Sequence, residues 1–444
     1  MQPPAQAPRT IAVVGAGPAG LYFLAALLDA APHALVDVYE SAPAPFGLVR
    51  YGVAPDHPRT RRISRVLAAG LSSPRVRYFG NVTVGRDVTL DELRRGYDAV
   101  VLATGMRGDR ELGIPGEHLP GSLGASELVE WYTGHPLATS PGSLAGVRAA
   151  AVVGAGNVAL DIARILARPA DDLRTTSMPR HVLETLRAST LTDVHLVARR
   201  GPAFAKYTSP ELHEIGHLDD VDVVVDPADL VLDDAGSAEV ENRRAARIIV
   251  DLTREWAARA PLGASRRIHL HFWRRPVRVL GEAQVTGIEL EPTTEGIGRP
   301  ATLDVDLLVR AIGYHGTAVP GLPYDDARGV VPSREGRVVD GDIVVEGMYV
   351  TGWLRRGPTG VIGTNRPDAA EVAAALAADL DVLAVREGSP DDVTELLAQR
   401  GVRVLSWADW LRLEAYEKAV GDRHGADPIV VHDLATVLSV LDSP

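Results

Sequence analysis

The stretch from Ile11 to Gly20, IAVVGAGPAG, decides the fold. Its first four residues are apolar, which predicts a buried strand, and the run Leu21–Ala30 that follows it reads as a helix. Between them, Gly15 permits a tight turn, Gly17 lets backbone amides approach a pyrophosphate, and Gly20 lets helix and strand pack closely. The stretch therefore predicts a strand, a turn and a helix that bind a dinucleotide.

The next expected strand, VDVYE, ends in Glu40. An acid at this position can accept hydrogen bonds from a ribose diol, while the N-terminus of the preceding helix attracts the phosphates. A glycine turn in an unrelated α/β protein is the alternative interpretation. The strand before the turn, the helix after it and the acid beyond them make that alternative the weaker one.

The pattern recurs in Arg148–Ala167, RAAAVVGAGNVALDIARILA, where Gly154 and Gly156 open the second turn. The strand that follows lies in VHLVARRGP and ends in Arg199 and Arg200, where the first copy has its acid. Two guanidinium groups bind a ribose 2′-phosphate as fork-like donors, whereas an acid would repel it. The first copy thus suits the adenosine of FAD and the second suits NADPH. Because arginine supplies nearly all basic residues of this chain, two ordinary surface arginines are the alternative.

Three further segments favour a flavoprotein in which one nucleotide domain interrupts the other: Tyr97–Gly105, Leu307–Tyr314 and the glycine-rich stretch Gly347–Thr364 before an expected helix at Asp368–Ala377. We therefore expect an α/β fold of two Rossmann-like, three-layer dinucleotide-binding domains, with the NADP domain inserted into the FAD domain. The expected ranges are 1–109 and 319–385 for the FAD domain, 110–318 for the NADP domain, and 386–444 for a C-terminal α/β extension. That extension alternates helical patches with a short β run, PIVVHDL.

Composition restricts the function. The 444 residues carry a net charge of −12, which argues against a nucleic-acid or membrane-surface binder. Without cysteine the chain forms no disulfide and no cysteine-ligated iron–sulfur cluster, so electron chemistry needs a bound organic cofactor; no metal site is expected. Ile11–Leu28 is uncharged, but its early glycines and proline suit a strand and turn rather than a membrane anchor. We therefore expect a cytoplasmic protein.

The motifs PFGLVRYGVAPDHP (Pro45–Pro58), GNVALDIARIL, ARRGP, SPELHE (Ser209–Glu214) and GWLRRGPTGVIGTN (Gly352–Asn365) resemble those of the adrenodoxin reductase-like ferredoxin–NADP⁺ reductases. The resemblance covers nearly the whole chain and implies FAD and NADP(H) as cofactors. It implies FAD contacts by Gly15, Gly17, Ala19, Gly20, Glu40, Leu48, Val84, Trp353, Gly360, Val361 and Ile362. It implies NADP contacts by Ala155, Gly156, Asn157, Val158, Arg199, Arg200 and Glu211, with Glu211 near the adenosine side, Arg110 at the domain junction and Gly360 shared by both ligands.

The resemblance also implies the activity: NADPH passes a hydride to flavin N5, and electrons leave one at a time to an acidic iron–sulfur protein such as ferredoxin, with a cytochrome P450 as one candidate terminal acceptor. The alternatives are an NADPH-dependent flavin diaphorase, quinone reductase or monooxygenase, and a non-catalytic NADP-binding sensor. His57 and Glu214 resemble a pair that the family places near the flavin for proton handling; the alternative is that they only order a turn and a helix end.

An acidic ferredoxin would need local basic patches on this acidic protein. Three arginine clusters are candidates, and a solvated surface is the alternative for each. The clusters are Arg50, Arg59, Arg61, Arg62 and Arg65; Arg243, Arg244 and Arg247; and Arg266, Arg267, Arg274 and Arg275 near Trp273.

Overall fold

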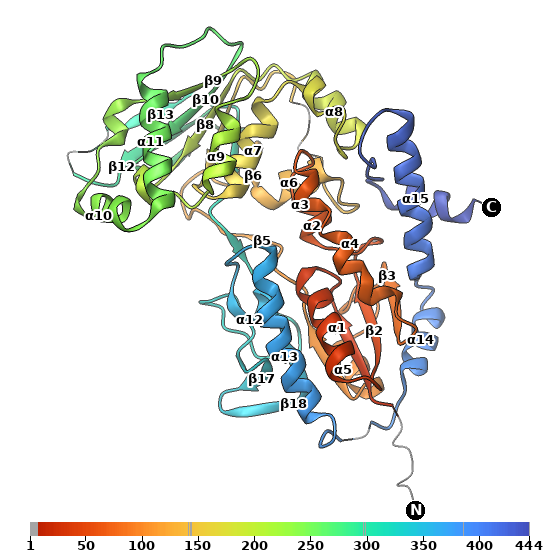
Figure 1. Ribbon diagram of the computed structural model, residues 1–444. Coiled ribbons are helices and arrows are strands. Elements are labelled where there is room, and N and C mark those ends of the chain that lie inside the picture. Colours follow the sequence, from red (N-terminus) through yellow and green to blue (C-terminus); the bar gives the residue numbers. More distant parts are fainter. Residues whose placement is uncertain are drawn as a thin grey trace, which may run out of the picture.

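The computed structural model describes residues 8–140, 142, 144–295, 297, 299–384 and 386–443. Two sheets organise the chain, each with helices on its faces, and they form the lower and upper halves of the molecule in Figure 1. The α/β fold with two dinucleotide-binding units is confirmed. The expected domain limits at residues 1, 385 and 444 lie outside the described residues, and we keep the domain boundaries as a proposal.

The lower sheet has seven strands in the order β16-β17-β18-β4-β1-β2-β3. From β18 to β3 all pairs are parallel, so β1 lies between β2 and β4 with its glycine turn at the carboxyl edge. Its strands are β1 (Thr10–Val14), β2 (Leu35–Glu40), β3 (Val76–Gly80), β4 (Ala99–Leu102), β16 (Ser333–Arg334), β17 (Arg337–Asp340) and β18 (Ile343–Val350).

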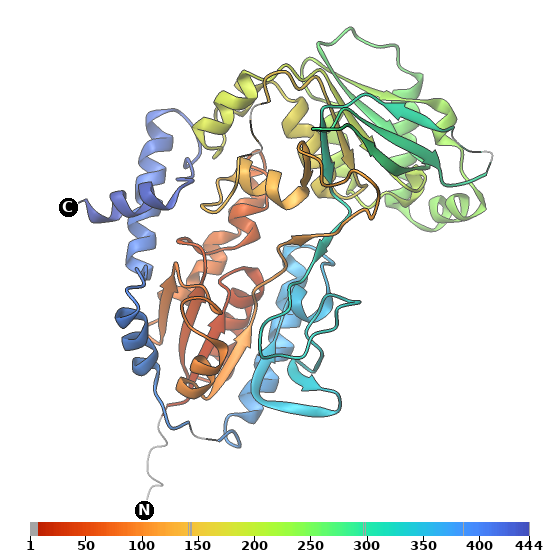
Figure 2. The same cartoon turned by 180° about the vertical axis from the view of Figure 1, so that it is seen from behind.

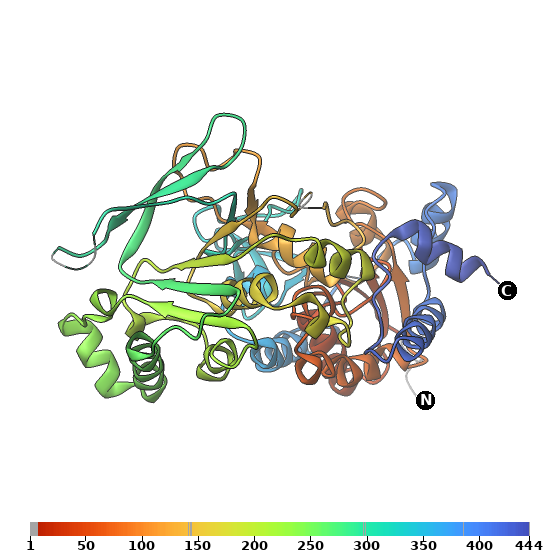
Figure 3. The same ribbon diagram turned by 90° about the horizontal axis from the view of Figure 1, so that it is seen from above.

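The upper sheet has six strands, all paired in parallel, in the order β6-β14-β7-β8-β10-β9. Its strands are β6 (Ser122–Gly124), β7 (Ala149–Val153), β8 (Asp193–Val197), β9 (Val221–Val225), β10 (Arg266–His271) and β14 (Leu307–Arg310). An antiparallel meander covers one face and projects from this half in Figure 3; it consists of β11 (Arg274–Leu280), β12 (Gly287–Pro292) and β13 (Ala301–Leu303).

The chain crosses between the halves at a two-stranded ribbon, β5 (Gly108–Asp109) with β15 (Tyr314–His315). The outgoing and returning segments run between the two halves in Figure 2. Residues from both sides of the inserted segment therefore meet at the junction.

Alternate residues of the lower strands are buried on both faces, as a parallel sheet covered by helices requires. Ile11 and Val13 pack into one core, with α1 (Pro18–Ala30) and α13 (Asn365–Asp379) over them. Ala12 and Val14 pack into the core on the opposite face. The other helices here are α2 (Leu48–Tyr51), α3 (Pro58–Arg61), α4 (Ser64–Leu67), α5 (Leu90–Gly96) and α12 (Trp353–Arg356), with 3-10 turns at Ala68–Ser72 and Ile362–Thr364.

In the upper half, α7 (Asn157–Ala167) packs on the sheet through Ile162, Ile165 and Leu166. The remaining helices are α6 (Ala125–Thr133), α8 (Arg180–Arg187), α9 (Ser209–Ile215), α10 (Asp234–Asn242) and α11 (Arg244–Ala258), with 3-10 turns at Ala170–Leu173, Pro202–Phe204 and Pro227–Leu230. Across the described ranges, no helix combines the length and apolar character needed to cross a bilayer.

The C-terminal extension packs against the lower half through α14 (Pro390–Gln399), α15 (Trp407–Arg423) and α16 (Leu434–Asp442). It was expected to be α/β, and that prediction is wrong for residues 386–443, where no strand is assigned apart from one bridge between Gly80 and Leu405. The stretch PIVVHDL joins no sheet, because the N–H groups of Ile429 and Val431 donate to Glu417 and that of Val430 donates to Ser177.

Candidate functional site

The first glycine turn lies where the carboxyl end of β1 meets α1. A Cβ at Gly20 would collide with the carbonyl oxygen of Gly15, and a Cβ at Gly15 would collide with that of Ala103. Gly15 also has φ +109°, which disfavours an L side chain. The turn is therefore packed so closely that only glycine fits at these positions, and it leaves the N-terminus of α1 free for phosphates.

Glu40 is fixed beside this turn. It is almost fully buried; Oε2 accepts from the Ala16 N–H at 2.9 Å, and Oε1 accepts from the Ala42 N–H at 3.0 Å. Oε1 also accepts from the Ser41 hydroxyl at 3.2 Å, so it is the second lone pair of Oε2 that can still accept from a ribose hydroxyl. Its position at the end of β2 is the one that the sequence predicts.

The glycine-rich stretch that follows β18 closes on the same turn. Gly352 has φ +75°, and a Cβ there would lie 2.5 Å from Cβ of Ala19. The Gly352 N–H donates to Asp368 at 2.6 Å, which fixes the start of α12. The Trp353 ring lies 5.5 Å from the Tyr314 ring of the junction ribbon. Beyond it, the stretch Gly360–Ile362 lies largely at the surface, where a ring system can reach its amides.

Two more expected FAD residues lie in the lower half, one of them next to the turn. Leu48 begins α2, directly after Gly47, whose added Cβ would lie 2.9 Å from Cα of Gly17. Val84 is partly buried and packs against the core of the lower sheet. The structure therefore brings α2 close against the glycine turn.

The second glycine turn has the same construction in the upper sheet. Gly154 has φ +157°, and a Cβ there would collide with the Ala311 carbonyl. The Ala155 carbonyl accepts from the Lys206 N–H at 2.7 Å, and the Asn157 side chain accepts from the Thr208 N–H at 2.8 Å. These bonds hold the segment before α9 next to the turn. Gly156 precedes α7 as its N-cap, and Val158 lies in its first turn.

Arg199 and Arg200 follow β8 and are both exposed. The Arg200 guanidinium lies over the Phe204 ring at 4.8 Å. No carboxylate pairs with either side chain in the part of the chain that the structure describes. Their donors are thus available to an anion beside the second turn.

At the junction, the Arg110 N–H donates to the Gly313 carbonyl at 3.0 Å and its Nε donates to the Tyr314 carbonyl at 3.2 Å. Arg110 therefore lies at the crossing between the halves, as the resemblance implies. Its side chain is bound to backbone of the returning segment.

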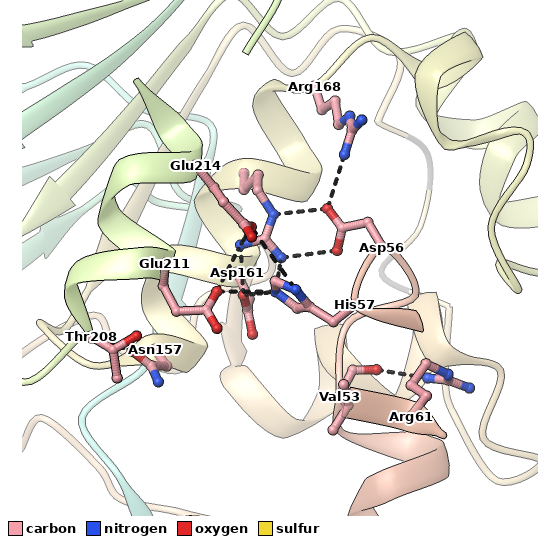
Figure 4. A network of polar contacts seen from close by, with 11 residues as sticks. Val53, Asp56, His57, Arg61, Asn157, Asp161, Arg168, Thr208, Glu211 and Glu214 are labelled. Carbon is pink, nitrogen blue, oxygen red and sulfur yellow. Dashed lines mark hydrogen bonds and ion pairs between the residues drawn. The ribbon is translucent and has the colours of Figure 1, made fainter. Parts of the chain in front are cut away.

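A buried ionic network joins the two halves close to this crossing (Figure 4). Arg164 of α7 is 1% exposed and donates to Asp56 of the lower half through Nε at 2.8 Å and Nη2 at 2.9 Å. His57 follows Asp56, and its Nε2 lies 3.1 Å from both Asp161 and Glu211. Its Nδ1 lies 3.9 Å from Glu214.

Comparisons with known proteins bear on this arrangement. Residues 9–225 match the family model described as pyridine nucleotide-disulphide oxidoreductase. NADPH-ferredoxin reductase FprA of Mycobacterium tuberculosis is 40% identical over 98% of this chain and 99% of its own. The mitochondrial NADPH:adrenodoxin oxidoreductase of Homo sapiens is 39% identical over 94% of this chain and 88% of its own. The solved structure of FprA in complex with NADPH matches with a TM-score of 0.90 at 39% identity, covering 98% and 100% of the two chains.

The chain belongs to the family of NADPH-ferredoxin and adrenodoxin reductases. The resemblance of the motifs is thereby confirmed, and the chain is an oxidoreductase of this family. The individual contacts of its residues with each cofactor stay a proposal.

The sequence did not single out several residues that this reductase brings together. Asp56, Asp161, Arg164 and Arg168 complete the network, with Arg168 3.2 Å from Asp56. Glu211, expected near the adenosine, has its carboxylate against His57 at the junction. His57, Asp161 and Glu211 have the spacing of metal ligands, but Arg164 already lies 2.8 Å from Asp161, so we assign no metal there.

The network sets the protonation of its members. Burial opposes a charge on His57, as does the Arg164 guanidinium, whose Nη2 lies 2.6 Å from the same Nε2. The contacts with Asp161 and Glu211 outweigh both and raise the pKa of His57 to about 10. The bond from His57 lowers the pKa of Glu211, whereas burial raises the pKa of Glu214. His57 is therefore protonated at neutral pH, and Glu214 takes up a proton more readily than an ordinary glutamate.

Replacing His57 with glutamine should give a pH-dependent loss of stability. Because the folded pKa is raised, the stabilisation is fully present below the unfolded value of about 6.5 and is lost as pH rises through about 10. With solvent screening taken into account, we expect the variant to lose roughly 2 kcal/mol of unfolding free energy at pH 6 and almost none above pH 10. Denaturant unfolding at pH 6, 8 and 10 measures it. His118, whose side chain is 69% exposed, is the control, and His118→Gln should show no such trend. A His57 effect that grows with pH would contradict the assignment.

The arginine clusters proposed for docking need correction. Arg50 and Arg274 are buried and paired with Glu417 and Asp229, so neither can meet a partner. Trp273 is also buried. Arg61 and Arg266 donate to backbone carbonyls, and Arg243 is paired with Glu239. Arg247 also donates to backbone carbonyls, those of Val240 and Glu241, but its side chain stays exposed. The other exposed arginines that are left in the first two clusters are Arg59, Arg62, Arg65 and Arg244.

Proposed function

We propose that the protein is an FAD-dependent ferredoxin–NADP⁺ reductase that moves electrons between NADPH and an acidic iron–sulfur protein. One contrast carries the proposal. In the lower half, the strand after the first glycine turn and its helix is β2, and it ends in the buried carboxylate of Glu40. In the upper half, the equivalent strand is β8, and it is followed by the exposed guanidiniums of Arg199 and Arg200. A carboxylate suits an unphosphorylated ribose, and guanidiniums suit a 2′-phosphate. The protein's relatives, the NADPH-ferredoxin reductase FprA and the NADPH:adrenodoxin oxidoreductase, support the same activity.

The residues present fit FAD. The first turn offers a helix N-terminus to the pyrophosphate, and the Gly352 turn lies against Ala19 at the same helix start. We propose that Gly15, Gly17, Ala19, Gly20, Glu40, Leu48 and Val84 hold the adenosine and pyrophosphate side, and that Trp353, Gly360, Val361 and Ile362 hold the ring side. When bound, FAD supplies the exchange between a two-electron hydride and single electrons.

The second turn fits NADP(H) in the same manner. We propose contacts from Ala155, Gly156, Asn157, Val158, Arg110 and Glu211, with Arg199 and Arg200 on the 2′-phosphate and Gly360 shared between the ligands. The network around Arg164 fixes α7 and α9 relative to the lower half, so it sets the distance between the two sites. Holding two bound reactants in a fixed geometry can supply much of the lowering of the activation barrier for hydride transfer between them.

His57 and Glu214 are the proposed proton-handling pair. The Nδ1 atom of His57 lies 3.9 Å from the Glu214 carboxylate, whose side chain is half exposed. Burial raises the pKa of Glu214, so this carboxylate takes up a proton more readily than an ordinary glutamate. At 3.9 Å from Nδ1 it lies beyond direct hydrogen-bond reach, so the proposed transfer between His57 and Glu214 runs through one water. The exposed side of Glu214 gives that proton its exit.

Ferredoxin-dependent turnover should fall steeply with salt, because an acidic partner meets the exposed arginines through screened charges. We expect kcat/KM for ferredoxin to drop about tenfold or more between 50 and 400 mM salt, while reduction of a small neutral quinone stays within about twofold. Arg244→Ala with Arg247→Ala, and separately Arg59→Ala with Arg62→Ala, would show which cluster docks. A flat salt response would contradict docking by charge.

The same assay separates the alternatives. Faster turnover with a quinone or oxygen than with ferredoxin would favour a diaphorase, quinone reductase or monooxygenase. A cytoplasmic location and a cytochrome P450 as terminal acceptor belong to the proposal as well; cell fractionation and product formation by a reconstituted P450 would test them.

A further inference from the structure

The C-terminal extension contributes a buried ion pair to the FAD half. Glu417 of α15 is 2% exposed, and Arg50 of α2 is 8% exposed. The two groups form a bidentate pair, with Nη1 of Arg50 donating to Oε2 at 3.0 Å and Nη2 donating to Oε1 at 2.5 Å. The partners are 367 positions apart in the chain. The pair therefore joins the far end of the chain to the beginning.

Arg50 lies in the segment that packs on the first glycine turn. α2 begins at Leu48, directly after Gly47, which approaches Gly17 closely. The Phe46 N–H donates to the Ala16 carbonyl at 2.8 Å. A shift of Arg50 is therefore transmitted to the backbone around the turn through one short helical turn.

Aromatic side chains fix the same pair. Trp410 of α15 lies under the Arg50 guanidinium at 5.0 Å and meets the Phe46 ring edge-on at 5.6 Å. The Cζ atom of the same guanidinium lies 5.1 Å from the centre of the Tyr51 ring. Ring contacts therefore add to the two hydrogen bonds of the Arg50 guanidinium. Together these interactions fix the position of α2 relative to α15.

Glu417 also binds the segment that leads to the upper half. Its Oε1 accepts from the Val431 N–H at 2.9 Å, and its carbonyl accepts from the Ile429 N–H at 3.2 Å. Between these residues, the Val430 N–H donates to the Ser177 carbonyl of the upper half at 3.2 Å. One carboxylate therefore connects α2, α15 and the strap 427–432, which runs to the upper half.

We propose that Glu417 is a positioning residue for the FAD site, and that the C-terminal extension retains the cofactor by holding α2 against the glycine turn. The inference rests on the proposed function, because it takes the first turn as the FAD site. A buried ion pair does not by itself make the protein more stable, since a protein with an apolar pair of similar volume is often at least as stable. Removing one partner, in contrast, leaves the other charge buried without compensation. Loss of Glu417 therefore drives Arg50 out of its site and moves α2.

The test measures FAD release from the full-length holoprotein. Bound flavin is diluted into buffer, and the rise in free FAD fluorescence gives the dissociation rate constant. We expect Glu417→Ala to raise this rate at least tenfold and Glu417→Gln to raise it less, because the amide still accepts one hydrogen bond. A rate for Glu417→Ala within twofold of wild type would overturn the proposal.

Leu441→Ala is the matched control for general loosening. Leu441 is a buried apolar residue of α16 in the same core. It should lower the unfolding temperature but keep the FAD dissociation rate within twofold of wild type. If Leu441→Ala releases FAD as fast as Glu417→Ala, retention follows stability alone and the proposal fails.

The possible outcomes distinguish failure of this inference from failure of the proposed function. If Glu417→Ala is recovered only as aggregate, Glu417→Gln decides, and a rate within twofold of wild type overturns the proposal. If the wild-type protein binds no FAD, the proposed function fails as well. If the wild type binds FAD and the Glu417 variants release it normally, only the role of the extension is lost.

Discussion

Replacing Arg199 and Arg200 together with alanine should lower kcat/KM for NADPH by roughly two to three orders of magnitude and leave kcat/KM for NADH within about threefold. Each guanidinium makes a charge-assisted hydrogen bond to the 2′-phosphate, worth about 1.5–3 kcal/mol. Because both guanidiniums are exposed, we use the lower part of that range, about 3–4 kcal/mol for the two bonds lost together, and every 1.4 kcal/mol is a factor of ten. NADH lacks that phosphate and so loses nothing. Anaerobic titrations that follow flavin bleaching with each coenzyme measure the preference.

The control for this prediction is a second arginine pair on the same half of the molecule. Arg275 and Arg278 of β11 are also largely exposed, but they face Glu291 and Glu289. Their joint replacement by alanine should leave the preference for NADPH unchanged. If the wild-type protein responds equally to NADPH and NADH, the assignment of Arg199 and Arg200 to the 2′-phosphate is wrong.

The glycine turns could be predicted because their physics is local. An added Cβ at Gly20 collides with the Gly15 carbonyl of the same segment, and Gly15 itself has a positive φ that favours glycine. Only the further collision of a Gly15 Cβ with Ala103 involves a distant part of the chain. The acid at Glu40 and the arginines at Arg199 and Arg200 could be placed because each lies at the carboxyl end of the strand that follows its glycine turn and helix. The order of strands and helices follows for the same reason.

The buried ion pairs could not be predicted, because their partners are distant in sequence. Asp56 and Arg164 are 108 positions apart, and each alone reads as a surface residue. Arg50 illustrates the error: its motif placed it in a basic patch, whereas the extension buries it. The strand predicted at PIVVHDL is wrong for a related reason: β propensity does not specify which segment the backbone will pair with.

Replacing Arg164 with leucine should destabilise the protein by about 3–5 kcal/mol, because Asp56 loses its two-bond partner and Asp161 loses one of its two cations. Arg168 and His57, which each make one contact with these carboxylates, compensate only in part. Arg168→Ala is the matched control: Arg168 pairs with the same Asp56, but its side chain is 29% exposed, so we expect a loss of about 1 kcal/mol or less. Denaturant unfolding of the two variants measures the difference.

A double-mutant cycle with Asp56→Asn separates the pair from the packing of Arg164. We expect a coupling energy of about 2–3 kcal/mol, because Arg164 and Asp56 share two hydrogen bonds. The pair joins α7 of the upper half to the segment before α3 in the lower half, so its loss also frees one half to move relative to the other. The rate of flavin reduction by saturating NADPH should therefore fall in Arg164→Leu even where the protein is fully folded. An unchanged rate would show that the ribbon of β5 and β15 positions the halves without the network.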